Sequence, residues 1–190
     1  MALPTLAEAE RLLASFALPD GIVTHSRGVS RVAAEAARLL AAAGVEVDPQ
    51  LVEVAALLHD VDKPATRDDG GRHGVVGARW MTERGYAELA APIASHPISC
   101  LLDAERTPRG WASVALAVAD RHVAQRFVTI DERIEDQARR YPAFRAELHA
   151  AREPARAMEA QLAAAAGLSA GELVARLRAV WESAAGAGPA

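Results

Sequence analysis

The sequence is short of aromatic residues, cysteine and long hydrophobic runs, and each shortage excludes a class of protein. Aromatic residues make up only 4% of the 190 residues, although hydrophobic residues make up 51%, much of it alanine. Because alanine has the highest helix propensity and loses no side-chain entropy in a helix, this composition favours an all-α fold. Cys100 is the single cysteine, which excludes an intrachain disulfide.

Positive charge is not in excess either. The formal net charge is −4 and the arginines are interleaved with acidic residues, so we expect no nucleic acid polymer as a partner. The N-terminus lacks a basic segment followed by a long apolar core, and no apolar run reaches membrane-spanning length. We therefore expect a cytoplasmic protein with no membrane partner. A homo-oligomer stays open.

Helix start and stop signals divide the chain, whose length predicts one domain. A serine or threonine followed three residues later by glutamate, a capping box, opens predicted helices at Thr5, Thr129 and Ser169. Asp48-Pro49 is typical of an N-cap followed by proline at the first helical position. The predicted helices span residues 5–16, 22–43, 49–59, 73–85, 87–95, 111–125, 131–141, an alanine-rich stretch after Pro142 that breaks or kinks at Pro154, and 169–183.

Histidines and aspartates sit at unusual places in this pattern. The chain has six histidines: His25, His59, His73, His96, His122 and His149. The first four fall at ends of predicted helices, where side chains can converge, and Asp60 follows His59 directly. Asp120 lies inside the most hydrophobic helix, where an uncompensated carboxylate is costly. Either an ion pair with Arg121 or Arg126 or a bound metal ion would compensate it, and imidazole and carboxylate donors from several elements suit a divalent cation.

The ordered set His25, His59-Asp60 and Asp120 resembles the H…HD…D signature of the HD-domain superfamily of metal-dependent phosphohydrolases. "AALLHDVDKP" is similar to the apolar helix, HD pair and lysine of that family, with aspartate where a glycine often precedes the lysine. "RHGVVGARWM" and "IASHP" resemble the segments that carry two further histidines in the two-metal, HDIG-like members. "LAVADRHVAQRFVTIDERIEDQARRYP" resembles the stretch around the last aspartate. The resemblance covers roughly residues 25–142.

The resemblance implies one or two divalent ions, whether Fe, Mn, Zn, Ni or Mg. It implies a first site formed by His25, His59, Asp60 and Asp120, and a second formed by His73 and His96, with Asp60 bridging the two. This complement is similar to that of symmetrical dinucleoside tetraphosphate hydrolases and, more loosely, of HD-GYP phosphodiesterases. Proline after His96 and the lack of a Gly-Tyr-Pro motif disfavour cyclic dinucleotides.

The expected domain organisation follows from the same resemblance. We expect residues 1–142 to form an HD-type metal-binding catalytic domain. Residues 143–185 should form a C-terminal helical extension packed on it, and residues 186–190 a frayed tail. His122 and His149 are not expected to be ligands, and Cys100 is expected to be a small buried residue.

The expected reaction is hydrolysis of a phosphate ester or anhydride of a small molecule, with a nucleotide as the expected substrate, by a metal-activated hydroxide. Asp60 would orient the nucleophile. Lys63 either binds the substrate phosphate as a point charge or is a solvent-exposed loop lysine, and Arg126 is a weaker candidate for phosphate binding. Two alternatives stay open. One is an HD-type di-iron oxygenase with the same ligands, and the other is a non-catalytic, metal-stabilised interaction module.

Overall fold

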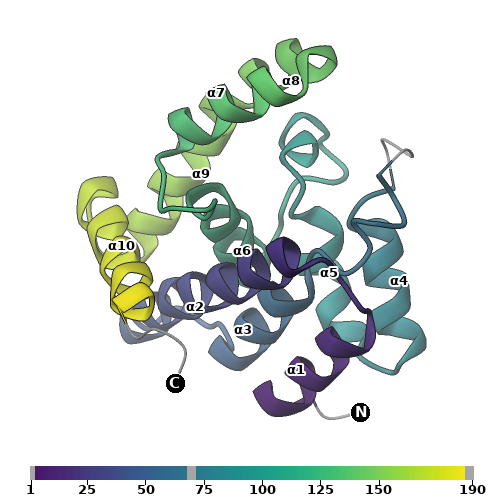
Figure 1. The fold of residues 1–190 in the computed structure, drawn as a ribbon. Coiled ribbons are helices and arrows are strands. Elements are labelled where there is room, and N and C mark those ends of the chain that lie inside the picture. Colours follow the sequence, from purple (N-terminus) through teal and green to yellow (C-terminus); the bar gives the residue numbers. More distant parts are fainter. Residues whose placement is uncertain (1–2, 68–71, 187–190) are drawn as a thin grey trace.

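The computed structural model describes residues 3–67 and 72–186, which form α-helices joined by short turns (Figure 1). The α-helices are α1 (Leu6–Ser15), α2 (Asp20–Ala42), α3 (Pro49–Leu58), α4 (Val75–Glu83), α5 (Ala90–Ser95), α6 (Trp111–His122), α7 (Ile130–Arg140), α8 (Arg145–Ala150), α9 (Arg152–Ala165) and α10 (Ala170–Gly186). Short 3-10 helices are η1 (Ala87–Leu89), η2 (Ile98–Leu102) and η3 (Pro142–Phe144). These described residues form no β-strand, so the predicted all-α class is confirmed.

The residues predicted to cap helices do so in the structure. The side chains of Thr5 and Thr129 each accept a hydrogen bond from the backbone N–H of the glutamate three residues later. The side chain of that glutamate accepts one from the backbone N–H of the threonine. Asp48 accepts from the backbone of Gln50 ahead of Pro49, which is the first residue of α3. Each cap satisfies N–H groups that have no partner inside the helix.

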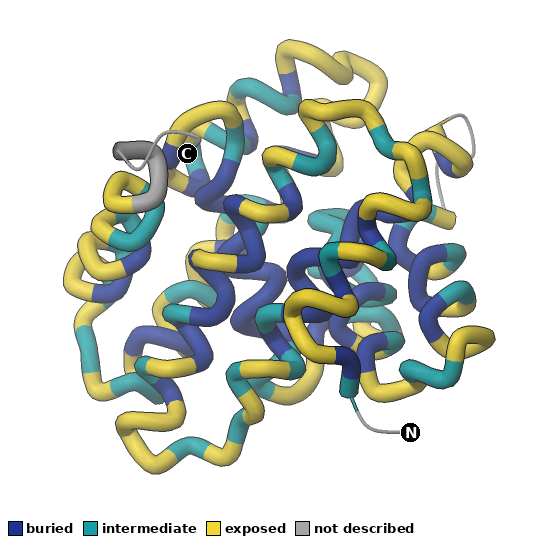
Figure 2. The backbone as a smooth tube through the Cα atoms, turned by 60° about the horizontal axis from the view of Figure 1, so that its bottom comes forward, coloured by how far each residue is buried: buried dark blue, intermediate teal, exposed yellow. Residues whose placement is uncertain are grey.

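The core is built around α2, α3 and α6, which pack against one another in the middle of the molecule. Figure 2 shows the buried backbone concentrated there, with the exposed segments at the periphery. Small residues at the α2 interface, such as Ala33, Ala36 and Ala37, are fully buried and let neighbouring helices approach closely. α6 is buried over most of its length, as its apolar sequence predicts.

Several helix boundaries differ from the prediction: α2 begins at Asp20 rather than residue 22, and α4 begins at Val75 rather than residue 73. α6 ends at His122 rather than continuing to residue 125, because Val123 is extended and Val128 N–H returns to the carbonyl of His122 at 2.8 Å. An isolated bridge between Val123 and Phe127 closes this turn. In the C-terminal part the break falls at Ala151, and Pro154 lies in the first turn of α9, where a missing N–H costs nothing.

The C-terminal helices pack onto the rest of the chain. α9 contacts α6 and α10 contacts α2, and Leu162 and Leu177 are fully buried members of the main core. A second, smaller cluster joins α7, α8 and α9 through residues that include Ile134 and Leu148. α7 and α8 lie together at the top of the view in Figure 1. The division at residue 142 stays a prediction, and the predicted tail lies outside the described residues apart from Gly186, which ends α10.

Within the part of the chain that the structure describes, no helix combines the length and the apolarity that crossing a bilayer requires.

Candidate metal centre

Six side chains predicted to bind metal converge at one place, although they come from separate elements. His25 lies on α2, and Asp120 lies on α6. His59 and Asp60 follow α3, and His96 follows α5. His73 precedes α4.

The two histidines that follow helices are oriented by the same local device. His59 is the C-cap of α3 and its Nδ1 lies 2.7 Å from the carbonyl of Ala56, and His96 is the C-cap of α5 with Nδ1 2.7 Å from the carbonyl of Ile93. Because a carbonyl only accepts, both Nδ1 atoms donate, and these bonds satisfy carbonyls that the helix end leaves free. Each Nε2 is therefore an unprotonated lone pair in the neutral ring, which is the form that binds metal.

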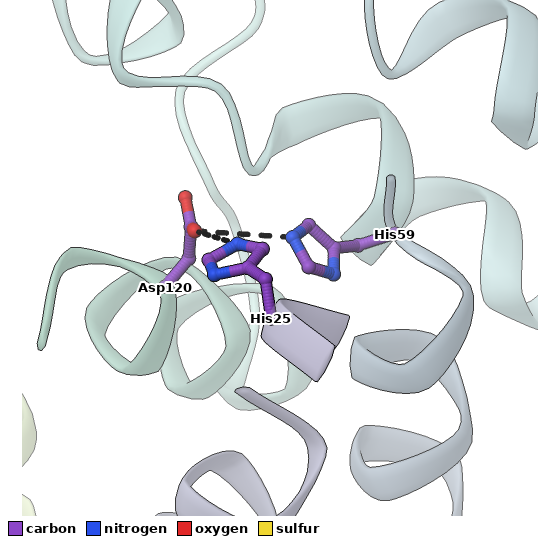
Figure 3. Close-up of side chains that lie close together, drawn as sticks. All are labelled: His25, His59 and Asp120. Atoms are coloured by element: carbon purple, nitrogen blue, oxygen red, sulfur yellow. Dashed lines mark hydrogen bonds and ion pairs between the residues drawn. The ribbon is translucent and has the colours of Figure 1, made fainter. Parts of the chain in front are cut away.

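The first group of ligating atoms comprises His25, His59 and Asp120, which point toward one another in Figure 3. Asp120 Oδ1 lies 3.1 Å from His25 Nε2 and 3.8 Å from His59 Nε2. Candidate ligand atoms of all three residues lie within 4.8 Å of one another. That is the spread expected of donors around a single ion.

The second group consists of His73 and His96, and it adjoins a set of ligand atoms from His59, Asp60 and His96 that also lie close enough to hold one ion. Their Nε2 atoms lie 3.1 Å apart, and His73 Nε2 is also 3.1 Å from Asp60 Oδ1. Two imidazole nitrogens in such contact need a proton or a cation between them. In the metal-free protein a proton serves, because burial lowers the pKa of His73 but hydrogen bonds to Asp60 and Asp62 outweigh it and raise the pKa to about 9.

The carboxylate of Asp60 lies between the two groups. Its Oδ2 is 3.7 Å from His25 Nε2, while its Oδ1 is 3.5 Å from His59 Nε2 and 3.6 Å from His96 Nε2. Burial alone would raise the pKa of Asp60, but His59 and Lys63 hold it well below its ordinary value. Asp60 is thus an ionised carboxylate whose Oδ2 faces His25 and whose Oδ1 faces the imidazoles of both groups.

Whether these residues fit a metal ion can be tested by asking which of their buried polar atoms lack a hydrogen-bond partner. His59 Nε2 is buried and has no hydrogen-bond partner, and Asp60 Oδ1 is buried with no well-aligned hydrogen bond, its nearest nitrogen being His73 Nε2 at 3.1 Å. Burial lowers the pKa of His59 to about 3, so its ring is neutral, and it also lowers the pKa of His96. A buried acceptor without a partner is costly, and a cation removes that cost at both atoms. The donor set therefore fits divalent ions, and the assignment of individual ligands stays a prediction.

Asp62 is a functional residue that the sequence reasoning missed. It is fully buried, its Oδ1 lies 2.8 Å from His73 Nδ1, and its Oδ2 accepts from the backbone N–H of Gly74 and Gly77 at 2.8 Å each. The first contact fixes the His73 ring so that Nε2 faces Asp60. One feature of the sequence could have pointed to it: Asp62 is an acidic residue close to the apolar helix, at the position where a glycine often precedes the lysine in the family.

Arg121 was noticed only as an alternative ion-pair partner for Asp120, and it does more than that. It is buried, its Nη1 donates to Asp120 Oδ2 at 2.8 Å, and its Nη2 donates to the carbonyl of His96 at 2.6 Å. It therefore ties a residue of the first group to the chain segment that carries the second. Burial would raise the pKa of Asp120, but His25 and Arg121 hold it well below its ordinary value.

The two residues predicted to bind phosphate lie in different positions. Lys63 Nζ is 2.7 Å from Asp60 Oδ2, and its side chain is 46% exposed, so it borders the centre. Arg126 lies beyond the end of α6 and pairs with Glu132 at 2.9 Å. The helical register that connected Arg126 with Asp120 is wrong. Arg133 on α7 reaches Asp120 instead, with Nη2 3.7 Å from Oδ1.

The remaining residues occupy structural positions. His122 is buried, stacks on Phe127, and lies 2.7 Å from Glu159 on α9 and 2.8 Å from the carbonyl of Val128. His149 is 43% exposed, and Cys100 is buried as a free thiol. Among the described residues, none of the three belongs to either set of potential metal ligands, which are His25, His59 and Asp120, and His59, Asp60 and His96.

The comparison with known proteins agrees with this geometry. The HD domain family matches residues 22–137, which is more than half of the chain and includes all six converging side chains. An uncharacterized protein of Methanocaldococcus jannaschii is 40% identical over 79 residues, 42% of this chain and 46% of that protein. The chain thus matches less than half of that relative's length. No solved structure matches. The chain belongs to the HD-domain superfamily of metal-dependent phosphohydrolases.

Proposed function

We propose that this protein hydrolyses a phosphate ester or anhydride of a small molecule, with a nucleotide as the expected substrate. The carrying observation is the convergence of four imidazoles and two carboxylates around His59 Nε2, which is buried and has no hydrogen-bond partner. Such a donor set has no use in a purely structural core, where buried polar atoms are normally paired.

The proposed ligands are His25, His59, Asp60 and Asp120 for one divalent ion and Asp60, His73 and His96 for a second. When bound, such ions would lower the pKa of water and offset charge on the phosphoryl oxygens. In the overall reaction the oxygen of water forms a bond to phosphorus. The bond from phosphorus to the leaving oxygen breaks, and the proton passes to that oxygen or to solvent.

The chain's own cations would bind the phosphoryl oxygens. Burial lowers the pKa of Lys63, but Asp60 and Asp120 outweigh it and raise the pKa, so the ammonium group stays charged. The side chain of Arg133 is only 14% exposed, and its one close carboxylate among the described residues is Asp120. Most of its donors therefore remain available to a phosphate, which suits a guanidinium fork.

A substrate screen with purified protein tests the proposal. The protein, loaded in turn with each candidate metal, is assayed for phosphate release from nucleoside mono-, di- and triphosphates. We expect turnover that Asp60→Asn abolishes. Lys63→Gln and Arg133→Gln should each reduce kcat/KM by about 10- to 100-fold, the size of one lost charged hydrogen bond, while Arg126→Gln should not. No phosphate release with any metal would refute the proposal, and a product formed only with iron and dioxygen would indicate an oxygenase instead.

A further inference from the structure

A pocket of about 450 Å³ adjoins the metal centre. Metal binding by the six proposed ligands does not account for it. Lys63 and His73 form part of its lining, so it is continuous with the centre that contains Asp60. Its far wall comes from α7, η3 and α8, the segment at the top of Figure 1. Its volume lies within the range of about 300–1,000 Å³ typical of small-molecule sites.

The charge of the lining changes along the pocket. Lys63 provides positive charge beside the metal centre, where a phosphate would lie, and Arg67 also lines the pocket. The far wall carries acceptors instead: Gln137 Oε1 is buried without a hydrogen-bond partner, and Glu147 adds an exposed carboxylate. A ligand that complements both ends has an anionic group at one end and N–H donors at the other.

Two exposed aromatic side chains line the same pocket. Tyr141 is 56% exposed and Phe144 is 49% exposed, and neither belongs to the two hydrophobic clusters. The apolar faces of these exposed rings are in contact with water. A flat ligand that stacks on them would remove that surface from water and so bind favourably. The pocket therefore offers ring contacts between its cationic end and its acceptor end.

We propose that this pocket binds the leaving group of the substrate, and that the leaving group carries an aromatic ring with N–H donors, as does the nucleoside released from an aminopurine nucleotide. The inference rests on the proposed function, because it assigns the specificity of the same site. Tyr141 and Phe144 contact the ring faces, and Gln137 and Glu147 accept from the ring's N–H groups. The C-terminal segment thereby determines which phosphate compound is hydrolysed.

The ring contact is tested with Phe144→Ala in the metal-loaded full chain. KM for adenosine 5′-monophosphate should rise about tenfold, the loss typical of truncating one stacking aromatic, while kinetics with inorganic tripolyphosphate should not change. Leu6→Ala on α1 is the matched control, because Leu6 is a similarly exposed apolar residue outside the pocket. Equal KM values for Phe144→Ala and wild type would overturn the ring contact.

The acceptor end is tested with a pair of substrates that differ in one amino group. Wild type should favour adenosine 5′-monophosphate over purine riboside 5′-monophosphate, which lacks the 6-amino group, by about tenfold, the value of one hydrogen bond left unmade. Gln137→Met should reduce that preference at least to half, and Gln161→Met, the same change on an exposed position of α9, should not. A preference that is absent in wild type, or unchanged in Gln137→Met, would overturn the assignment.

Equilibrium binding separates failure of the pocket from failure of the proposed function. Calorimetric titration of the metal-loaded protein with adenosine 5′-monophosphate should show weaker binding for Phe144→Ala than for wild type, whether or not hydrolysis occurs. Binding that depends on Phe144 without any phosphate release would support the pocket and refute the hydrolase. Phosphate release together with equal affinities of wild type and Phe144→Ala would support the hydrolase and refute the pocket.

Discussion

Replacing Asp62 by asparagine tests whether the second group of ligands depends on a residue that itself holds no metal. In the structure one carboxylate oxygen of Asp62 accepts from His73 Nδ1 and the other from the N–H groups of Gly74 and Gly77. Asparagine has the same shape but only one acceptor oxygen. The two backbone donors retain that oxygen, so the amide NH₂ must face His73.

The consequence is a change of tautomer at His73. An NH₂ group donates, and therefore Nδ1 of His73 has to accept and the proton moves to Nε2, which then has no lone pair for a metal ion. Losing the partner that orients a ligating histidine typically costs 10–100-fold in metal affinity, or about 1.4–2.7 kcal/mol. The group formed by His25, His59 and Asp120 makes no contact with Asp62 and should retain its affinity.

The assay is metal titration of apo-protein by calorimetry, with metal content measured by mass spectrometry, and nitrogen NMR of the histidine rings above pH 9, where His73 is neutral, to identify the tautomer. We expect one of two binding events to weaken by the stated factor and the His73 ring to change tautomer. Asp103→Asn is the matched control, because Asp103 accepts from the backbone of Glu105 at the surface. Two unchanged binding events in Asp62→Asn, or a His73 ring protonated at Nδ1 as before, would refute the reasoning.

Three further outcomes are expected. His59→Ala should lose the first metal ion, whereas His149→Ala should retain it, as metal analysis will show; equal loss would mean that the wrong histidines were assigned. Because the pKa of His59 is about 3 in the folded protein and about 6.5 when unfolded, only the unfolded chain takes up this proton between those values, so acid favours unfolding. Urea denaturation of apo-protein should show about 2 kcal/mol lost from this residue between pH 6.5 and pH 5, and a slope unaltered by His59→Gln would contradict it. Gly28→Ala places a methyl group against the ring of Trp181 and should lower the free energy of unfolding by about 1–3 kcal/mol, whereas Gly171→Ala meets nothing within 4 Å and should not.

Local chemistry explains why the helix starts were predictable and some helix ends were not. The caps at Thr5, Asp48 and Thr129 depend on residues within three positions of one another, so the sequence contains all of their parts. The end of α6 depends instead on Val128 returning to His122, a pairing that apolar periodicity does not report. The expected continuation to residue 125 failed for that reason, and with it the reason for selecting Arg126.

The sequence by itself determined the all-α class and the identity of the residues that converge, because helix propensity is a local property and the ordered H…HD…D pattern resembles that of a known family. It could not determine that Asp62 orients His73, or that Arg133 rather than Arg126 reaches Asp120. It also gave no indication of the pocket beneath Tyr141 and Phe144. These features depend on how α4 and α7 are placed against the centre, and that placement results from packing between segments that lie far apart along the chain.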